Sequence, residues 1–465
     1  MEIIFNLKIL LQKFLLAIIF ATGLFSPILS AQESIDLISL YQEALRNDAI
    51  LSSARYQNEA AQELVKQGKS LFFPSITMNA NFDNQDKERK FLTSSLPDNA
   101  LLSGSKADYE SYDYGVTIKQ PLFDYSAYAQ YKKILSQVSL ADKQHIKTQQ
   151  DLIQRISKAY FETLLAKDQV DLFQYQRASI QGQLSKAEAQ FEAGLISVTD
   201  INEAKTKKAL IEAQQISAIQ KLKIKRREIQ VITGKLPAKL NPLKPVITFT
   251  EIENLADDWI AIAQENNLEL QMKKDEIKIA QREIEFRRSD HYPTVDAIAT
   301  RSRSWDKGGY PYGATANGGI RSFSDTIGVA ISIPIFSGGM TSSRIREAVL
   351  LKSKLEHDVE YLSRGIDLKV REYYLSLQTN FAEINAYQQA MAAATLQLES
   401  TQLGFQEGLR NSVEVLDAQQ ILFNAKLNVL ESRYNYIMNF INLKLSVGML
   451  TISDLDEINQ YLMAS

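Results

Sequence analysis

Four short segments of the chain carry apolar residues at every second position, the pattern of a β-strand with one apolar face. In the first of them Ile76, Met78, Ala80 and Phe82 are apolar, and the residues between them are polar. We therefore expect four amphipathic strands, arranged along the chain as two pairs. The four segments lie at about 75–84, 111–122, 294–301 and 323–336.

Two much longer segments carry apolar residues seven positions apart, which is the spacing of a coiled-coil seam. They predict helices over 126–193 and 340–407, each about 100 Å long at about 1.5 Å per residue. A shorter helix is expected to return after each one, over 199–233 and 413–447. The first seam consists of Leu152, Ala159, Ala166, Phe173, Ile180 and Ala187, and the second of Val370, Leu377, Ile384, Met391, Leu398 and Phe405.

Each long helix is followed by a glycine that marks the tip of a helical hairpin. These residues, Gly194 and Gly408, stand 214 positions apart. Glycine suits such a turn because it enters left-handed backbone conformations without a clash at Cβ. Two prolines that end corresponding segments, Pro74 and Pro293, show a similar offset of 219 positions. The order helix, strand, loop, strand, long helix and return helix thus occurs twice, which indicates an internal duplication.

The first 31 residues are typical of a secretory signal peptide. Lys8 and Lys13 precede an apolar run that ends at Phe25, and small residues follow up to Ala31. An uncleaved membrane anchor is the alternative, but the run is short for a span and no later stretch approaches about 20 apolar residues. Any membrane crossing by the mature chain is therefore expected to use strands. The expected parts are a signal peptide at 1–31, a first repeat at 32–234, a proline-containing linker at 235–254, a second repeat at 255–450 and an acidic tail at 451–465.

Composition excludes several classes of function. The net charge is −3 and no basic stripe is present, which argues against nucleic acid as a partner. The chain has no cysteine, so disulfides and thiolate metal sites are absent. Its three histidines, His145, His291 and His357, lie on separate segments without the spacing of metal ligands. We find no catalytic or nucleotide-binding constellation, and we expect neither an enzyme nor a cofactor or metal.

Four strands per chain cannot close a membrane barrel, because about eight strands are the practical minimum. An open sheet edge is not tolerated in lipid. Copies of the chain must therefore share one barrel, and three copies would supply twelve strands and leave a lumen. The expected fold class is α+β: a membrane β-barrel with four strands from each chain, continued by a long helical coiled coil.

Several motifs together resemble the TolC family of outer-membrane efflux and type I secretion channels. They are the two Phe-x-x-Gly-Leu turns, Thr199-Asp200, the segment from Val413 to Asp417, the segment from Ile333 to Gly339 and the segment from Tyr434 to Ile437. The resemblance covers essentially the whole mature chain. It implies a homotrimer in the outer membrane, with a 12-stranded barrel in lipid and a 12-helix tunnel through the periplasm. It also implies partners, namely a periplasmic adaptor (membrane fusion protein) and an inner-membrane pump that opens the tunnel.

The function implied by this resemblance is passive conduction of drugs, toxic small molecules or secreted proteins out of the cell. The alternative from a different class is a periplasmic coiled-coil adaptor or scaffold protein without a pore. The paired amphipathic strands argue against that alternative.

The resemblance also assigns roles near the hairpin tips. Glu414 and Asp417, three positions apart on one side of a helix, match carboxylates that form rings in the pore constriction. The alternative for them is a structural one, in which acidic residues complement the positive end of the helix dipole. A second set, the gate lock, links neighbouring helices and holds the tip shut. It consists of Thr199, Asp200, Phe405 and Arg410, and Phe405 stands where some members have a tyrosine, so the lock is expected to depend on the Asp200–Arg410 charge pair.

Overall fold

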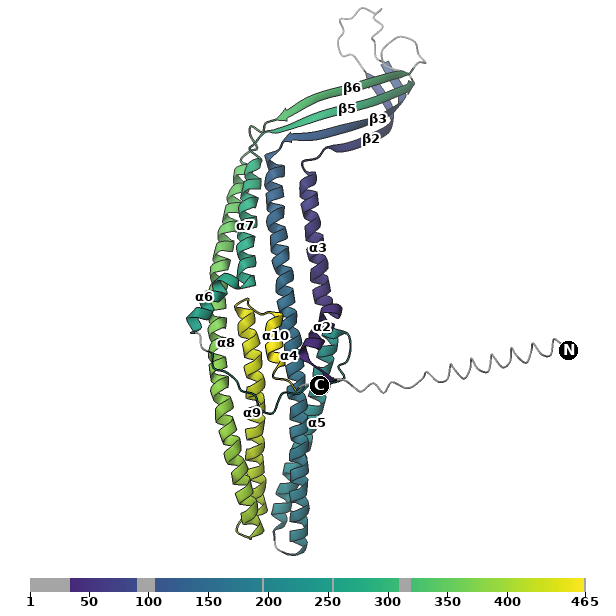
Figure 1. Cartoon of the computed structure of the whole chain (residues 1–465). Coiled ribbons are helices and arrows are strands. Elements are labelled where there is room, and N and C mark those ends of the chain that lie inside the picture. The colour runs from purple at the N-terminus through teal and green to yellow at the C-terminus, as the bar shows by residue number, and fades with distance from the viewer. Residues whose placement is uncertain (1–33, 90–104, 195, 253–254, 309–318, 464–465) are drawn as a thin grey trace, which may run out of the picture.

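The computed structural model describes residues 34–89, 105–194, 196–252, 255–308 and 319–463. The expected signal peptide at 1–31 lies outside these residues. The molecule is elongated, with a curved sheet at one end and two helical hairpin tips at the other (Figure 1). Six elements, α2, α3, β2, β3, α4 and α5, are followed by α6, α7, β5, β6, α8 and α9, which are the same types in the same order.

Two very long helices run most of the length of the molecule. They are α4 (Tyr125–Glu192, 68 residues) and α8 (Met340–Gln406, 67 residues). Their return helices are α5 (Val198–Thr233) and α9 (Ser412–Ser446). Five of the six seam residues of α4 are buried, with Leu152 and Ala187 both at 0% exposure, and Phe173 is half-buried; on α8 the first three residues of the seam are buried. The periodicity therefore identified the inward faces of both helices.

The helix expected at the start of each repeat is in fact two helices. The segment 35–72 forms α2 (Leu37–Asn47) and α3 (Ala49–Ser70), and the segment 259–286 forms α6 (Ala256–Asn266) and α7 (Leu268–Ser289). The break falls at Asp48 in the first case and at Asn267 in the second. Each of these side chains accepts a hydrogen bond from the backbone three residues later and so caps the following helix. Such a cap in the middle of a helical pattern leaves the apolar periodicity intact, which is why the pattern did not show it.

The helices form a single curved layer with two open sides. In the half near the tips α4 packs against α5 and α9, and α9 packs against α8. In the half near the sheet the order is α3, α4, α7 and α8. The layer therefore has α3 and α5 at one side and α8 at the other, with the short helix α6 packed on the outside of α8, as Figure 1 shows.

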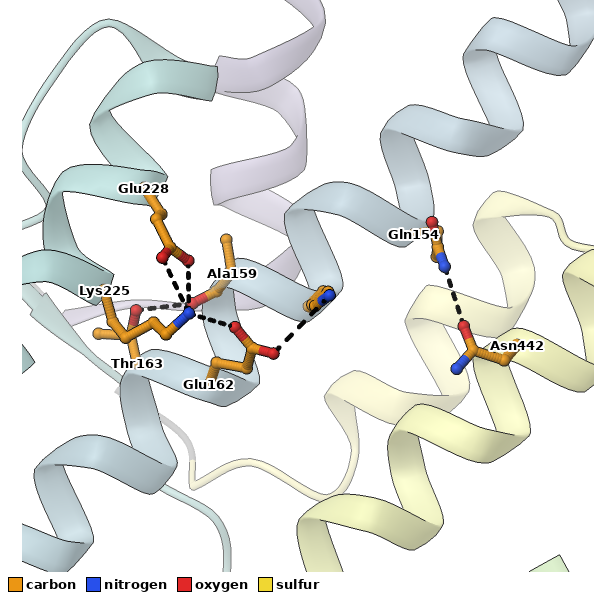
Figure 2. A network of polar contacts seen from close by, with 8 residues as sticks. Gln154, Ala159, Glu162, Thr163, Lys225, Glu228 and Asn442 are labelled. Atoms are coloured by element: carbon orange, nitrogen blue, oxygen red, sulfur yellow. Dashed lines mark hydrogen bonds and ion pairs between the residues drawn. The ribbon is translucent and has the colours of Figure 1, made fainter. Parts of the chain in front are cut away.

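The middle of the molecule holds its largest hydrophobic core, to which α2, α4, α8 and α9 contribute. Polar contacts tie α4 to both neighbours at this level (Figure 2). Lys225 of α5 lies 2.8 Å from Glu162 of α4, and Gln154 of α4 donates to the Asn442 side chain of α9 at 3.0 Å. Burial would lower the pKa of Lys225, but its bonds to Glu162 and Glu228 outweigh burial and raise that pKa.

The expected linker and tail are parts of this core. A short strand, β4 (Lys239–Leu240), pairs in parallel with β1 (Ser34–Ile35), and helix α10 (Ile452–Asn459) packs against α2. Leu455 and Ile458 of α10 are buried at 0% and 1% exposure. Three apolar side chains of residues 451–465, Leu455, Ile458 and Leu462, are buried and dock this segment against the core.

The four long strands form one antiparallel sheet in the order β2, β3, β5, β6. Their bounds are Ser75–Arg89, Ser105–Phe123, Thr294–Gly308 and Ile320–Ser332. One face carries apolar rows such as Ile76, Ile118, Ala299 and Ile327, which are exposed or half-exposed in the single chain. The opposite face is hollowed and lined by small and polar side chains: Asn79, Asn81, Asp113, Gly115, Thr117, Thr300, Ser302, Ser304, Ser322 and Ser324.

The strand ends differ from the prediction. All four strands extend beyond the predicted bounds toward the hairpin loops, and residues 84–89, which were expected to be a loop, pair with 105–110. Hydrogen bonds between the backbones of neighbouring strands continue where both faces of the sheet are polar. The alternation of apolar and polar residues therefore ends before the strand ends. The last strand instead ends at Ser332, earlier than the predicted residue 336. Pro334 has no N–H to donate and cannot continue a ladder.

Candidate functional site

The two hairpin tips lie together at the end of the molecule opposite the sheet (Figure 1). Gly194 and Gly408 have φ angles of 73° and 76°, in the left-handed region. Each N–H donates to the carbonyl of the phenylalanine three residues earlier, Phe191 at 2.8 Å and Phe405 at 3.2 Å. The two tips therefore use the same glycine geometry to stop a long helix within one residue.

The second tip begins α9 with a complete capping box. The Asn411 side chain accepts from the N–H of Glu414 at 2.9 Å, and the Glu414 carboxylate accepts from the N–H of Asn411 at 3.4 Å. Arg410 lies 2.6 Å from the other Glu414 oxygen. The hydrogen bond from Arg410 is the main reason that the pKa of Glu414 lies below its ordinary value. Glu414 is thus a charged residue in a structural role at the helix start.

Asp417, one turn further along α9, pairs across the gap between the two hairpins. Its carboxylate lies 2.5 Å from the ammonium of Lys207 on α5. Lys207 also contacts Glu203 of its own helix at 3.0 Å. Burial would lower the pKa of Lys207, but the bonds to Asp417 and Glu203 outweigh burial and raise it. The Lys207 side chain therefore stays charged across the physiological range.

The expected lock residues of one chain are not brought together as a set. Ser197 caps α5 and donates to the Thr199 hydroxyl at 3.2 Å, so Thr199 is engaged at its own helix start. Asp200 lies in the first turn of α5, and no ion pair with Arg410 forms within the described chain, where Arg410 is paired with Glu414. Phe405 is half-buried and supplies the carbonyl of the tip turn. An Asp200–Arg410 pair therefore requires a neighbouring chain or a different arrangement of the tip.

The packing between the hairpins is thin at this end. The apolar cluster of the tip comes almost entirely from α4 and α5, and Leu416, at 1% exposure, is the buried member contributed by α9. Several side-chain amides of α4 and α9 are buried. Within the described residues the side-chain atoms Gln176 Nε2, Gln183 Oε1 and Gln419 Oε1 have no hydrogen-bond partner. An interface with unpaired buried amides is weakly stabilised and is readily hydrated.

Sequence reasoning did not identify Lys207. A lysine on a helix rich in lysine is usually a solvated surface residue. The role of Lys207 depends on the position of α9, which lies far away in the sequence. The signal that could have found it is the one-turn spacing of Glu203 and Lys207, which places an acid and a base on one side of α5.

Within the described part of the chain, no group of three or more histidine, cysteine, aspartate or glutamate side chains is arranged to hold a metal ion. None of the described helices combines the length and the apolar composition needed to span a membrane. The geometry of the tips therefore offers fixed charges and a weak interface, with no reaction centre among the described residues.

Comparison with known families decides the identity. The family model described as outer membrane efflux protein matches residues 40–235 and 259–449, which is most of the chain. The chain belongs to the outer membrane efflux protein family. It is accordingly an outer-membrane channel-family protein with a large periplasmic part, and it is not an enzyme.

Individual members of the family match over nearly their full length. The proteases secretion protein PrtF of Dickeya chrysanthemi is 27% identical over 430 residues, covering 91% of this chain and 90% of its own. The outer membrane protein TolC of Vibrio cholerae is 28% identical over 450 residues, covering 95% and 97%. The crystal structure of the Campylobacter jejuni CmeC outer membrane channel shares the fold, with a TM-score of 0.73 at 14% identity over 92% of this chain and 90% of that one. Family membership favours the channel over the periplasmic adaptor.

Proposed function

We propose that three copies of this chain form one channel that conducts drugs, toxic small molecules or secreted proteins passively out of the cell. The sheets form a 12-stranded barrel in the outer membrane, and the helices form a closed cylinder through the periplasm. An inner-membrane pump and its periplasmic adaptor supply the energy and open the tip. The names of the relatives, a protease secretion protein and TolC, support efflux or secretion as the process.

The observation that carries the proposal is the pair of open sides of the single chain. Both outer strands of the sheet, β2 and β6, pair on one side only within the described residues. Unpaired backbone groups in lipid are strongly unfavourable, so these edges need partners. Joining β6 of one copy to β2 of the next satisfies both edges and closes the ring.

Helices α8 and α5, at the two sides of the layer, also carry surfaces suited to contact with a neighbouring copy. Along α8 exposed apolar residues recur at seven-residue spacing, on the side opposite its buried seam, and α5 carries a shorter seam of the same kind. Exposed seams of this length are typical of helices that pack against another helix. They lie on the two opposite sides of the layer, so one copy can cover the other. The residues on α8 are Tyr361, Leu368, Leu375, Leu396 and Leu403, and those on α5 are Leu210, Ile224 and Val231.

The repeated order of elements supports an internal duplication. The family model matches the chain in two stretches, one in each proposed repeat, 32–234 and 255–450. The helix breaks at Asp48 and Asn267 are 219 positions apart, the same offset as Pro74 and Pro293. We infer that the twelve strands and twelve long or return helices of the assembly descend from a half-sized unit.

At the closed tip we place Glu414 and Asp417 in the pore constriction and Asp200 and Arg410 in the lock between neighbouring chains. The resemblance of the tip segments to the family supports this placement. In the single chain both carboxylates of the constriction are already paired, Glu414 with Arg410 and Asp417 with Lys207. Opening then requires that the adaptor bind the open tip more tightly than the closed one.

The test begins with the purified protein in mild detergent. Its native mass should equal three chains, and in planar bilayers it should form a narrow, cation-preferring pore. A stable monomer that retains its full strand content would overturn the proposal. Replacing Glu414 and Asp417 together with alanine should weaken the cation preference while leaving the mass unchanged.

A further inference from the structure

Lys207 is the cation that joins the two hairpins of one chain at their tips. It projects from α5, belongs to the first hairpin and pairs with Asp417 of the second hairpin at 2.5 Å. The Lys207 side chain is 24% exposed, whereas that of Asp417 is 61% exposed. The lysine is thus the anchored partner, and the aspartate is the one that faces open space.

The neighbouring packing fixes this pair. Leu416, directly before Asp417, is buried in the tip cluster with Ile201, Ala204 and Ile211 of the first hairpin. Ala204 and Ile211 lie within one turn of Lys207 on either side, so the docked leucine sets the face of α9 that meets the lysine. Glu203 holds the ammonium from its own helix at 3.0 Å. The position of the charge is therefore determined by a buried contact.

We propose that Lys207 is a selectivity-determining residue of the channel, because it offsets the charge of Asp417 at the constriction and ties α9 to α5 there. The inference rests on the proposed placement of Asp417 in the pore. Lys207, Asp417 and Glu203 together carry one net negative charge, and Arg410 and Glu414 together carry none. The constriction is therefore less negative than its carboxylates alone indicate.

Lys207 acts on permeating ions through its electric field. Ions in a narrow lumen respond to the summed field of the fixed charges within about a Debye length, about 8 Å at physiological salt. A cation 2.5 Å from the carboxylate is well inside that distance. Because burial is outweighed by its two acidic partners, Lys207 does not lose its proton in the working range. The offset is thus a permanent property of this chain.

The experiment measures cation over anion permeability from reversal potentials in planar bilayers under a KCl gradient. The variants are Lys207→Met, Asp417→Asn, their combination, the conservative Lys207→Arg and the control Lys205→Met. Lys205 lies on the same helix with a side chain that is 57% exposed, and its acidic neighbour Glu188 belongs to the same hairpin, 3.9 Å away. Each variant is first shown to have the parent's native mass.

We expect the two single variants to change the cation over anion permeability ratio in opposite directions. Lys207→Met should raise the permeability ratio by roughly twofold or more and strengthen block by La³⁺, and Asp417→Asn should lower the ratio. The permeability ratio of the combined variant should return close to that of the parent, and the ratios of Lys207→Arg and Lys205→Met should equal that of the parent.

A parent-like ratio for Lys207→Met together with a lowered ratio for Asp417→Asn would overturn the role of Lys207. If neither Asp417→Asn nor Glu414→Gln changes the ratio, the proposed constriction itself is wrong. Should Lys207→Met fail to assemble, the charge exchange Lys207→Asp with Asp417→Lys replaces it, and a ratio unlike the parent's then contradicts the proposal.

Discussion

Arg155 binds the carboxylate of Asp48 through both of its terminal nitrogens, each 2.9 Å from one oxygen. The same carboxylate accepts a hydrogen bond from the N–H of Leu51 at 2.7 Å and so caps α3. Asp48 is 2% exposed. One buried side chain therefore sets the break between α2 and α3 and fastens both to α4.

Replacing Asp48 with alanine should lower the free energy of unfolding by about 3 kcal/mol, because it leaves Arg155 without its partner in a partly buried site. The measurement is urea unfolding in detergent, followed by circular dichroism. The control is Glu59→Ala, which removes an exposed pair with Arg55 at 3.9 Å and should cost less than about 1 kcal/mol. If both variants lost the same free energy of unfolding, the buried Asp48–Arg155 pair would contribute no more than an exposed ion pair.

The same pair predicts a dependence on pH. Burial would raise the pKa of Asp48, but Arg155 and the Leu51 N–H outweigh burial and hold it below its ordinary value. Its stabilising contribution is then present above the unfolded value of about 3.9 and is lost as pH falls through the folded value. The stability difference between the parent and Asp48→Asn should therefore be large at neutral pH and shrink below about pH 4. A difference that is constant down to low pH would contradict this account.

Charge on the exposed seam of α8 should prevent assembly. Leu396 is 65% exposed in the single chain and is proposed to be buried between copies. A glutamate at this position would forfeit about 2 kcal/mol of apolar burial in each copy and would place an unpaired charge in the interface. We expect Leu396→Glu to yield monomers by native mass measurement.

The matched control for this variant is the next residue. Gln397 is exposed on the same helix but points about a quarter turn away from the seam. Gln397→Glu adds the same charge and should leave three chains together. Monomers from both variants would indicate a general effect of charge on α8, whereas trimers from both would remove this seam from the interface.

The proposed lock predicts leakage when it is broken. Asp200→Ala or Arg410→Ala should raise the resting conductance several-fold in planar bilayers without changing the native mass. An exposed ion pair contributes about 0–1 kcal/mol, so three pairs bias the closed state without fixing it. Exchanging the two charges, Asp200→Arg with Arg410→Asp, should restore part of the closure.

Glu414 provides the comparison that this test needs, because it is the partner of Arg410 within the chain. If Arg410 acts only at the start of α9, Glu414→Gln should reproduce the conductance of Arg410→Ala while Asp200→Ala conducts like the parent. That result would remove the lock between chains. Arg227→Ala, an exposed arginine of α5 remote from the tip, should have no effect.

Much of this architecture follows from periodicity. The seven-residue seams located the long helices to within about a residue at most ends, because a coiled-coil face repeats over many turns. The alternation of apolar and polar residues located the strands only where one face is apolar. Toward the hairpin loops both faces of the sheet are polar, so nothing in the sequence indicates that residues 84–89 continue to pair with 105–110.

The tip was predictable only in part. The turns at Gly194 and Gly408 could be recognised because glycine alone suits their φ angles. The partners of the charged residues could not, because Lys207 and Asp417 lie 210 positions apart and meet through the docking of Leu416. The exposed seams of α5 and α8 have the same seven-residue spacing as the buried ones. They could have been read from the sequence, but spacing alone does not say whether a seam faces its own chain or another.

The first and last described segments of the chain meet in its central core. The N–H of Leu37 donates to the Asn459 side chain at 3.2 Å, the Asn459 amide donates to Asp36 at 2.9 Å, and β1 pairs with β4 from the middle of the sequence. During export the segment that leaves the cytoplasm first must therefore wait for the segment that leaves last. Until then the long hairpins and both sheet edges stay uncovered in the periplasm, where unpaired strands and apolar seams aggregate. Completion of the central core is accordingly a late step in the folding of this protein, because it waits for residues near 460.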